Sequence, residues 1–324
     1  MFLSLIFVAF LLAVVQGFAR VVAYFWEWLS RGRDLNEGEV ERARVAMEES
    51  EDVLERGLAR AERRRGLGRV LARVNASNEA VEEYLDHLTL GWYQVIIVFF
   101  VGCMVGLLIE EVWMLVSTGV HESRVGLVWG PFSPMYGFGA VFLTVASFLL
   151  RRHGARGWQI FLASAVMGGL LEQGTGWLMS TLFDAESWTY AYLPDKITQW
   201  VAWRFLVMWG LIGLVWARAV TPRLLYQIGM PTSRRQLVFV SLVALYLVAD
   251  VAMTVVCFNR KVARDAGVPA ANAFEQWVDT NYSDEFISER FENLKLGEAR
   301  DPLDENGNPL LSPEEAMELA RRNR

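Results

Sequence analysis

The chain has 324 residues, of which 53% are hydrophobic and 13 are tryptophans, a composition too apolar for ordinary soluble domains. The net charge of −6 argues against a nucleic-acid partner, and only two cysteines exclude a disulfide or zinc framework. We therefore expect an all-α protein, a polytopic bundle of membrane helices, because only a helix satisfies its own backbone groups in lipid.

Six stretches are predicted to cross the bilayer, each apolar over about 20 residues. The first, residues 2–19, is followed by an aromatic interfacial run at 24–28. A cleaved signal peptide is the alternative, but no basic residues precede this apolar core. The other five spans are expected at about 89–109, 130–150, 157–183, 197–217 and 236–258.

Four segments follow from this pattern: an N-terminal transmembrane helix (1–30), a charged helical insert (31–88), a five-helix membrane core (89–258) and a polar tail (259–324). The insert carries eleven arginines, and further arginines follow the third and fifth spans. The positive-inside rule then places the insert in the cytoplasm and both termini outside a bacterial plasma membrane.

The insert contains no proline and mixes both charge signs, as a solvated helical hairpin or short coiled coil does. Val40, Met47, Leu54 and Ala61 recur every seven residues, although the alternate heptad positions are mostly not apolar. Both a solvated spacer and a docking site for a partner fit this composition.

Charged residues inside a bilayer cost about 2.5–3.5 kcal/mol each, so each one requires an explanation. At 1.5 Å per residue, Glu172 and Asp250 lie roughly 21 Å from the cytoplasmic face, and Arg204 lies roughly 10 Å below the outer surface. All three fall in one layer, which predicts a buried polar network. Its function is either structural or the binding of a ligand, ion or proton.

Two features accompany this network. Small residues share the helix face of Glu172, at 165, 168, 169 and 176, so this face is expected to contact another helix. Glu110 and Glu111 end the second span, where they lie in interfacial water or line a site that opens outward.

The third span begins with a broken helix, rich in glycine and proline from 126 to 140. Irregular backbone at this depth is tolerated where protein buries it or a cavity lines it. We expect a wall of a polar cavity, while a simple proline-led helix start is the alternative. The expected wall residues are Trp129, Gly130, Pro131, Pro134, Tyr136 and Gly137.

The tail contains a stretch, 304–315, that places oxygen donors at five loop positions of a calcium-binding EF-hand. Pro309 stands where the turn needs glycine, so a turn followed by a helix capped by Ser312 is favoured. The sequence contains no phosphate-binding loop, no hydrolase motif and no pair of histidines at metal spacing. We therefore expect no cofactor, no metal site and no catalytic residue.

Several motifs resemble the bacterial family of putative ABC-transporter type IV permeases. The family is similar at 106–110 (GLLIE), 129–139 (WGPFSPMYGFG), 171–172 (LE), 176–178 (GWL), Trp188, Tyr190, Pro194, 209–210 (WG), 282–285 (YSDE) and 290–293 (RFEN), so the resemblance covers about 95–296. This chain departs from the family at Thr189, where the family has aspartate, and at 199–200, where it has Gly-Arg. Arg204 is a hypothetical substitute for that missing arginine.

The resemblance implies a membrane protein related to transport, with a separate ATPase chain if transport is ATP-driven. With this resemblance, the buried polar residues favour a permease-like subunit in which Glu172 and Asp250 bind a cation or exchange protons, with Arg204 tuning their charge. A scaffold, regulator or assembly factor is the alternative, and an intramembrane enzyme with Glu110 or Glu172 as general base is a third. The expected partners are the lipid bilayer and that ATPase. Further copies of the same chain, in a homo-oligomer, are also possible partners.

Overall fold

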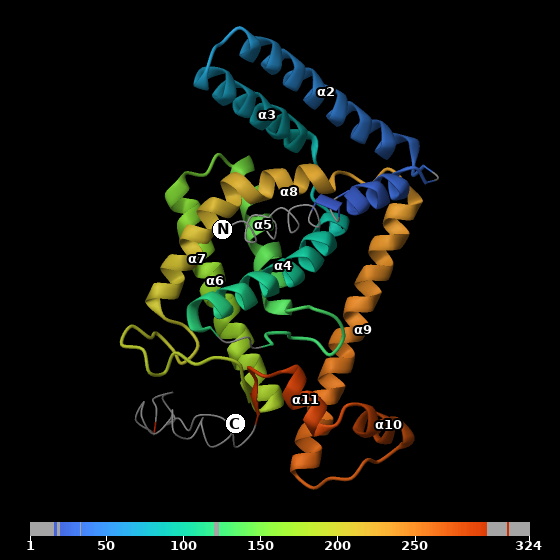
Figure 1. Ribbon diagram of the computed structural model, residues 1–324, viewed down its shortest axis with the longest axis vertical. Helices are drawn as coiled ribbons and strands as arrows, with labels where there is room; N and C mark the ends of the chain where they lie inside the picture. Colours follow the sequence, from blue (N-terminus) through green and yellow to red (C-terminus); the bar gives the residue numbers. More distant parts are fainter. Residues whose placement is uncertain (1–15, 18–19, 33, 120–122, 297–309, 311–324) are drawn as a thin grey trace, which may run out of the picture. The chain divides into compact units, whose positions relative to one another are not determined.

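The computed structural model describes residues 16–17, 20–32, 34–119, 123–296 and 310, and helices make up most of them (Figure 1). The predicted all-α class is confirmed. After a helical stretch at 20–30, the elements are α2 (Glu37–Glu62), α3 (Leu67–His87), α4 (Trp92–Thr118), α5 (Pro134–Arg152), α6 (Gly157–Phe183), β1 (Ala185–Glu186), α7 (Trp203–Val215), a π-helical turn (Trp216–Val220), α8 (Thr221–Ile228), α9 (Arg234–Asp265), α10 (Ala273–Asn281), α11 (Asp284–Arg290) and β2 (Lys295–Leu296).

The chain divides into two compact units. One comprises Met1–Gln94 and Leu225–Ala244, and the other comprises Val95–Leu224 and Leu245–Arg324. These units cut across the four segments expected from the sequence. The helical insert groups with the first turns of α9, and the polar tail groups with the membrane core.

In the first unit, α2 and α3 pack side by side as a helical hairpin (Figure 1). A Cβ atom on Gly57 would lie 2.4 Å from that of Ala76, so the helices approach here almost to backbone contact. Ser50 Oγ donates a hydrogen bond of 2.8 Å to the Ala80 carbonyl inside this interface. Small residues therefore form the contact between α2 and α3. Met47, one of the residues that recur every seven positions, is exposed instead.

The base of the hairpin, where α3 ends, is hydrogen-bonded to the loop that precedes α9. The Tyr84 hydroxyl accepts a hydrogen bond of 2.9 Å from the Met230 N–H, and Gln94 Nε2 donates one of 2.9 Å to the Gly229 carbonyl. Gly229 has a φ of 67°, a left-handed conformation that favours glycine. The base of the hairpin is thus held by hydrogen bonds to backbone atoms.

Among the described residues, four stretches are long and apolar enough to cross a membrane: Trp92–Ser117, Pro134–Arg152, Trp203–Ile228 and Arg234–Asp265. The expected count of six is not confirmed. The first expected span lies mostly outside the described residues. Helix α6 has the predicted bounds, 157–183, but Gln159, Glu172 and Gln173 make it too polar to qualify by hydropathy.

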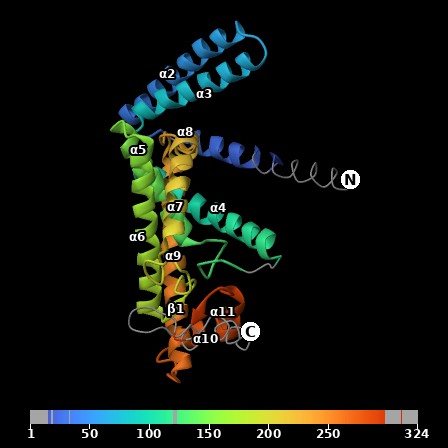
Figure 2. The ribbon, with the colours of Figure 1, turned by 90° about the vertical axis from the view of Figure 1, so that its left-hand side faces the viewer.

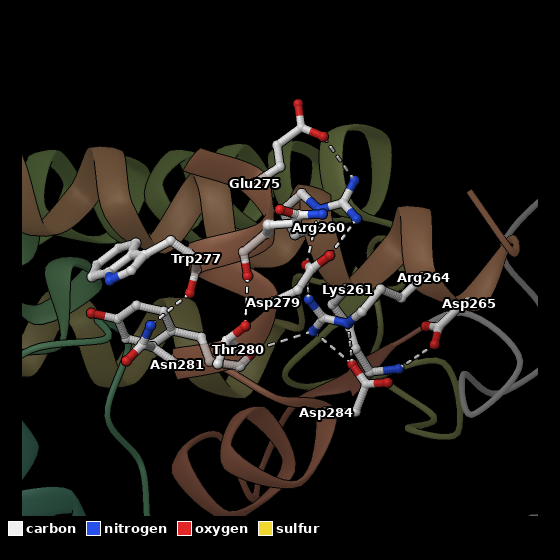
Figure 3. Close-up of polar contacts among 12 residues, drawn as sticks. Arg260, Lys261, Arg264, Asp265, Glu275, Trp277, Asp279, Thr280, Asn281 and Asp284 are labelled. Carbon is white, nitrogen blue, oxygen red and sulfur yellow. Dashed lines mark hydrogen bonds and ion pairs between the residues drawn. The ribbon is translucent and has the colours of Figure 1, made fainter. Parts of the chain in front are cut away.

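The polar tail folds against the end of α9, where α10 and α11 lie beside it in both views (Figures 1 and 2). Arg260 is buried and pairs with Asp279 at 2.6 Å and with Glu275 at 3.3 Å (Figure 3). Arg264 adds ion pairs to Asp279 and, at 2.6 Å, to Asp284 (Figure 3). Two arginines on one face of α9 therefore hold both short helices.

Beyond α11, the chain forms β2, which pairs antiparallel with β1 directly after α6. The segment that resembles a calcium loop, 304–315, lies outside the described residues except for Leu310.

Candidate functional site

The face of α6 that carries Glu172 packs against α7. A Cβ atom on Gly168 would lie 2.1 Å from the Trp209 ring, and one on Gly176 would lie 2.4 Å from the Trp200 ring. Only glycine allows these indoles to sit against the α6 backbone. The expectation that this small-residue face contacts another helix is confirmed.

Glu172 is 3% exposed within this interface. Its Oε1 accepts a hydrogen bond of 3.1 Å from Trp209 Nε1. Its Oε2 is buried and has no hydrogen bond of ordinary geometry among the described residues, although the Tyr190 hydroxyl interacts with the carboxylate. The α6–α7 contact thus buries a carboxyl group with one oxygen incompletely satisfied.

Tyr190 reaches Glu172 from the connection between β1 and α7. Its N–H donates to the Gln199 carbonyl at 2.7 Å, and its ring stacks on Phe205 with centroids 4.4 Å apart. Burial, followed by the charge of Glu172, raises the pKa of the Tyr190 hydroxyl. The phenol therefore stays a proton donor at neutral pH.

A second carboxylate, Glu110 of α4, lies near the same tyrosine. Glu110 forms an ion pair of 3.6 Å with Arg124 and a side-chain hydrogen bond with the Tyr136 hydroxyl of α5. Tyr190 is close enough to interact electrostatically with both Glu110 and Tyr136. We call Glu110, Tyr136, Glu172 and Tyr190 the acid–tyrosine cluster.

The glycine- and proline-rich segment before α5 is bound through its backbone atoms by residues outside the acid–tyrosine cluster. The Trp129 N–H donates to Asp250 Oδ1 at 2.8 Å, and the Val128 N–H donates to Thr254 Oγ1 at 2.9 Å. The Arg290 guanidinium donates to the carbonyls of Leu127, at 3.1 Å, and of Gly130. We call Asp250, Thr254 and Arg290 the loop clamp.

The loop clamp buries its acid completely. Asp250 is 0% exposed, and its Oδ2 has no hydrogen bond among the described residues. The Arg290 charge lies close enough to interact with both Asp250 and Glu111. An arginine does accompany Asp250, as expected, but it comes from α11 of the tail and not from position 204.

The residues of the expected cavity wall do not form one group: Tyr136 belongs to the acid–tyrosine cluster, and the loop clamp binds the backbone of Trp129 and Gly130. Gly130 has a φ of 67° and Pro134 is the first residue of α5, so the proline-led helix start is borne out. The Trp129 indole donates to the Tyr282 hydroxyl at 3.0 Å. A Cβ atom on Gly137 would lie 2.4 Å from Cys103 Sγ. Pro131 lies in the turn between Gly130 and α5.

Arg204 does not join Glu172 or Asp250. Its guanidinium binds Asp195 at 2.6 Å, and half of its side-chain surface is exposed. The chain folds back before α7, with the Ile197 N–H bonded to the Val201 carbonyl at 2.7 Å, so α7 begins at Trp203. Arg204 is therefore in the first helical turn and not deep in a span. Its guanidinium lowers the pKa of Asp195.

Sequence reasoning missed three of the residues that complete these groups: Arg124, Tyr190 and Arg290. Tyr190 and Arg290 do fall within motifs that resemble the family, and this was the signal available. A separate group, Glu49, Glu83 and His87, places potential metal-ligand atoms within 4.8 Å of one another on the hairpin. These side chains are 40–48% exposed, and His87 Nε2 lies 2.6 Å from a carboxylate oxygen of Glu49.

Four apolar helices of spanning length, with buried carboxylates between or beside them, define a helical membrane protein. Residues 97–255 match the family described as "Putative ABC-transporter type IV". The resemblance seen in the motifs is thereby confirmed over these residues. The match includes the acid–tyrosine cluster and Asp250 but ends before Arg290. No curated protein and no solved structure matches the chain significantly.

Proposed function

We propose that the protein is a permease-like subunit of a membrane transporter and that its acid–tyrosine cluster binds a cation or exchanges protons. The observation that carries this proposal is Glu172: a carboxyl group buried in a close helix contact, with one oxygen lacking an ordinary hydrogen bond. Burying a carboxyl group is costly and is common at ion and proton sites in membranes. Its partner Tyr190 offers a hydroxyl that interacts with the same carboxyl group.

Asp250 has a different role in this proposal from the one expected from the sequence. Its hydrogen bond to the Trp129 N–H gives it a structural task, so proton or cation exchange is assigned to Glu172, with Glu110 at the far end of the cluster. Arg204 tunes neither group, because it pairs with Asp195 at 2.6 Å. The transported substrate is not specified by this cluster.

Flux through the purified protein tests the site. Proteoliposomes containing a pH-sensitive dye, with a potential imposed across the membrane, report proton or Na⁺-coupled proton movement. We expect the wild type and Glu289→Gln, which alters an exposed acid of the tail, to show the same flux. Glu172→Gln is expected to insert and fold but to abolish the flux. Equal flux in Glu172→Gln would refute the assignment.

The imposed potential drives the flux in this test. Where transport is ATP-driven, the ATPase must be a separate chain, because the sequence has no phosphate-binding loop. The family match supports such an association. Cross-linking in native membranes, followed by purification of the tagged protein, tests it directly. Recovery of an ATPase chain is expected, and its consistent absence after cross-linking would argue against an ATP-driven subunit.

A scaffold or regulator is the second candidate, and the loop clamp favours it. There a buried acid and an arginine bind backbone atoms of one loop, which is a structural arrangement. If the acid–tyrosine cluster is also only structural, Glu172→Ala lowers the amount of folded protein with no separable loss of flux. The flux measurement on the folded fraction of Glu172→Gln therefore distinguishes the two candidates.

A further inference from the structure

The hairpin tip carries an apolar stripe that no described residue covers. Leu67, Val70, Leu71 and Val74 of α3 are 74%, 56%, 55% and 48% exposed. Their spacing of three and four residues places them on one helix face. The opposite face of α3 contacts α2, where Ala76 is buried. The stripe therefore points away from the hairpin partner.

Lipid-core exposure does not explain this stripe. Neither α2 nor α3 is apolar enough to be a membrane span, and both carry many charges. Many of the other exposed apolar residues do lie on candidate spans, such as Leu108 and Trp113 of α4. Four adjacent large apolar side chains on a charged hairpin form a contiguous patch of the kind that marks an interaction surface.

The stripe is surrounded by positive charge. Between residues 56 and 74 the chain has seven arginines and a single acid, Glu62. Arg63, Arg64, Arg65 and Arg73 are exposed, and none forms an ion pair within the described part of the chain. An apolar helix face bordered by free arginines is the pattern of a helix that lies in a membrane interface.

We propose that the hairpin tip binds the surface of an anionic lipid bilayer. The arginines bind headgroup phosphates, and the apolar stripe enters the boundary between headgroups and acyl chains. Two observations favour lipid as the partner. The arginines complement the negative charge of the headgroups, and α3 ends at His87, only a few residues before the candidate span that begins at Trp92. This inference is independent of the proposed transport role.

The length of the hairpin constrains the bound state. The 21 residues of α3 make a helix roughly 30 Å long, so its first turns lie far from the membrane-spanning α4 along the chain. The tip reaches a flat bilayer only when the hairpin lies along the surface. The α2–α3 connection at 63–66 then contacts the headgroups.

A fluorescent reporter in the full-length protein tests this inference. Leu71→Cys is labelled with a polarity-sensitive dye after reconstitution into nanodiscs of phosphatidylcholine alone or of phosphatidylcholine and phosphatidylglycerol in equal amounts. Glu48→Cys, at an exposed position of α2 away from the tip, serves as the matched control site. Cys103 and Cys257 are buried, so their background labelling is small.

We expect a blue shift at Leu71→Cys in the anionic nanodiscs and quenching by spin-labelled lipid, with neither effect at Glu48→Cys. Both effects should disappear at high salt, because exposed charges are screened. They should also disappear when Arg63, Arg64 and Arg65 are replaced together by Gln, exchanges at exposed positions that leave the hairpin interface intact. An equal shift in phosphatidylcholine alone, persistence in the triple variant, or no shift in any lipid would overturn the proposal.

Discussion

The Trp129 N–H and the Asp250 carboxylate are joined by a hydrogen bond of 2.8 Å between residues 121 positions apart. This bond links the irregular segment before α5 to the middle of α9. It satisfies a backbone donor that no helix or strand would satisfy, and it gives a buried acid a partner. The conformation of the loop and the burial of Asp250 therefore each depend on this hydrogen bond.

Removal of this acceptor should destabilise the protein. Asp250→Leu leaves the Trp129 N–H without a partner, which costs about 1–3 kcal/mol for a buried donor. Asp250→Asn keeps an acceptor oxygen and should lose less. A thiol-reactive dye measures the unfolding midpoint, because Cys103 and Cys257 are 0% and 1% exposed and react when the fold opens. Equal midpoints for the two variants would contradict the hydrogen-bond account.

Any side chain at Gly168, where α6 lies closest to α7, should destabilise the protein. A Cβ atom at Gly168 would overlap the Trp209 ring, so Gly168→Ala should cost about 1–3 kcal/mol through overpacking. Gly174, on the same helix, has open space around it, and Gly174→Ala is the matched control. The same dye-based unfolding measurement applies. An unchanged midpoint in Gly168→Ala would mean that the helices pack differently.

Acid should loosen the tail through Asp279. Hydrogen bonds from Arg260, and then from Arg264, lower the pKa of this carboxyl group. A lowered folded-state pKa stabilises the folded protein above the unfolded value of about 3.9, and this contribution is lost as the pH falls through the folded value. The midpoints of the wild type and Asp279→Asn should therefore differ at pH 6, and the difference should shrink progressively as the pH falls below about 3.9.

The control for this titration is Asp265→Asn. Asp265 pairs with Lys261 on the same helix, and its side chain is 48% exposed. Exposed pairs of this type contribute little. Asp265→Asn should follow the wild type at every pH. A midpoint difference for Asp279→Asn that does not shrink as the pH falls below about 3.9 would assign the effect to something other than protonation.

The hydrogen bonds from Arg290 to two backbone carbonyls should form only with an arginine at this position. A guanidinium donates to the Leu127 and Gly130 carbonyls at once, whereas a lysine ammonium is a compact charge that lacks this fork. Arg290→Lys should speed amide hydrogen exchange in residues 126–133 several-fold, measured by mass spectrometry. Glu289→Gln, at the neighbouring exposed position, should leave the exchange unchanged. Unchanged exchange in Arg290→Lys would show that charge alone holds the loop.

Local pattern predicted the helices well. The bounds of α6 agree with the prediction, and the small residues at 168 and 176 correctly marked its contact face. Helix α4 was predicted to end at about 109 but continues to Thr118. Glu110 was read as the end of an apolar run, yet a helix continues through charge where partners such as Arg124 and Tyr136 compensate it.

Contacts between distant residues were less accessible. Depth counting assumed a straight helix from Ile197, and this placed Arg204 too deep because residues 195–202 fold back. The Asp195–Arg204 pair is only nine residues apart, but spacing within a loop does not fix distance. Tyr190 and Arg290 reach their partners through tertiary folding, which no local periodicity encodes.

Arg290 and Gly130 are 160 residues apart, so the contact between them has a consequence for synthesis in the cell. At about 5–20 residues per second, the ribosome adds the arginine roughly 8–32 s after it has made the glycine. Throughout that interval the nascent segment at 126–133 lacks the guanidinium that will bind its carbonyls. The loop therefore reaches its final set of hydrogen bonds only after the chain has been made as far as α11.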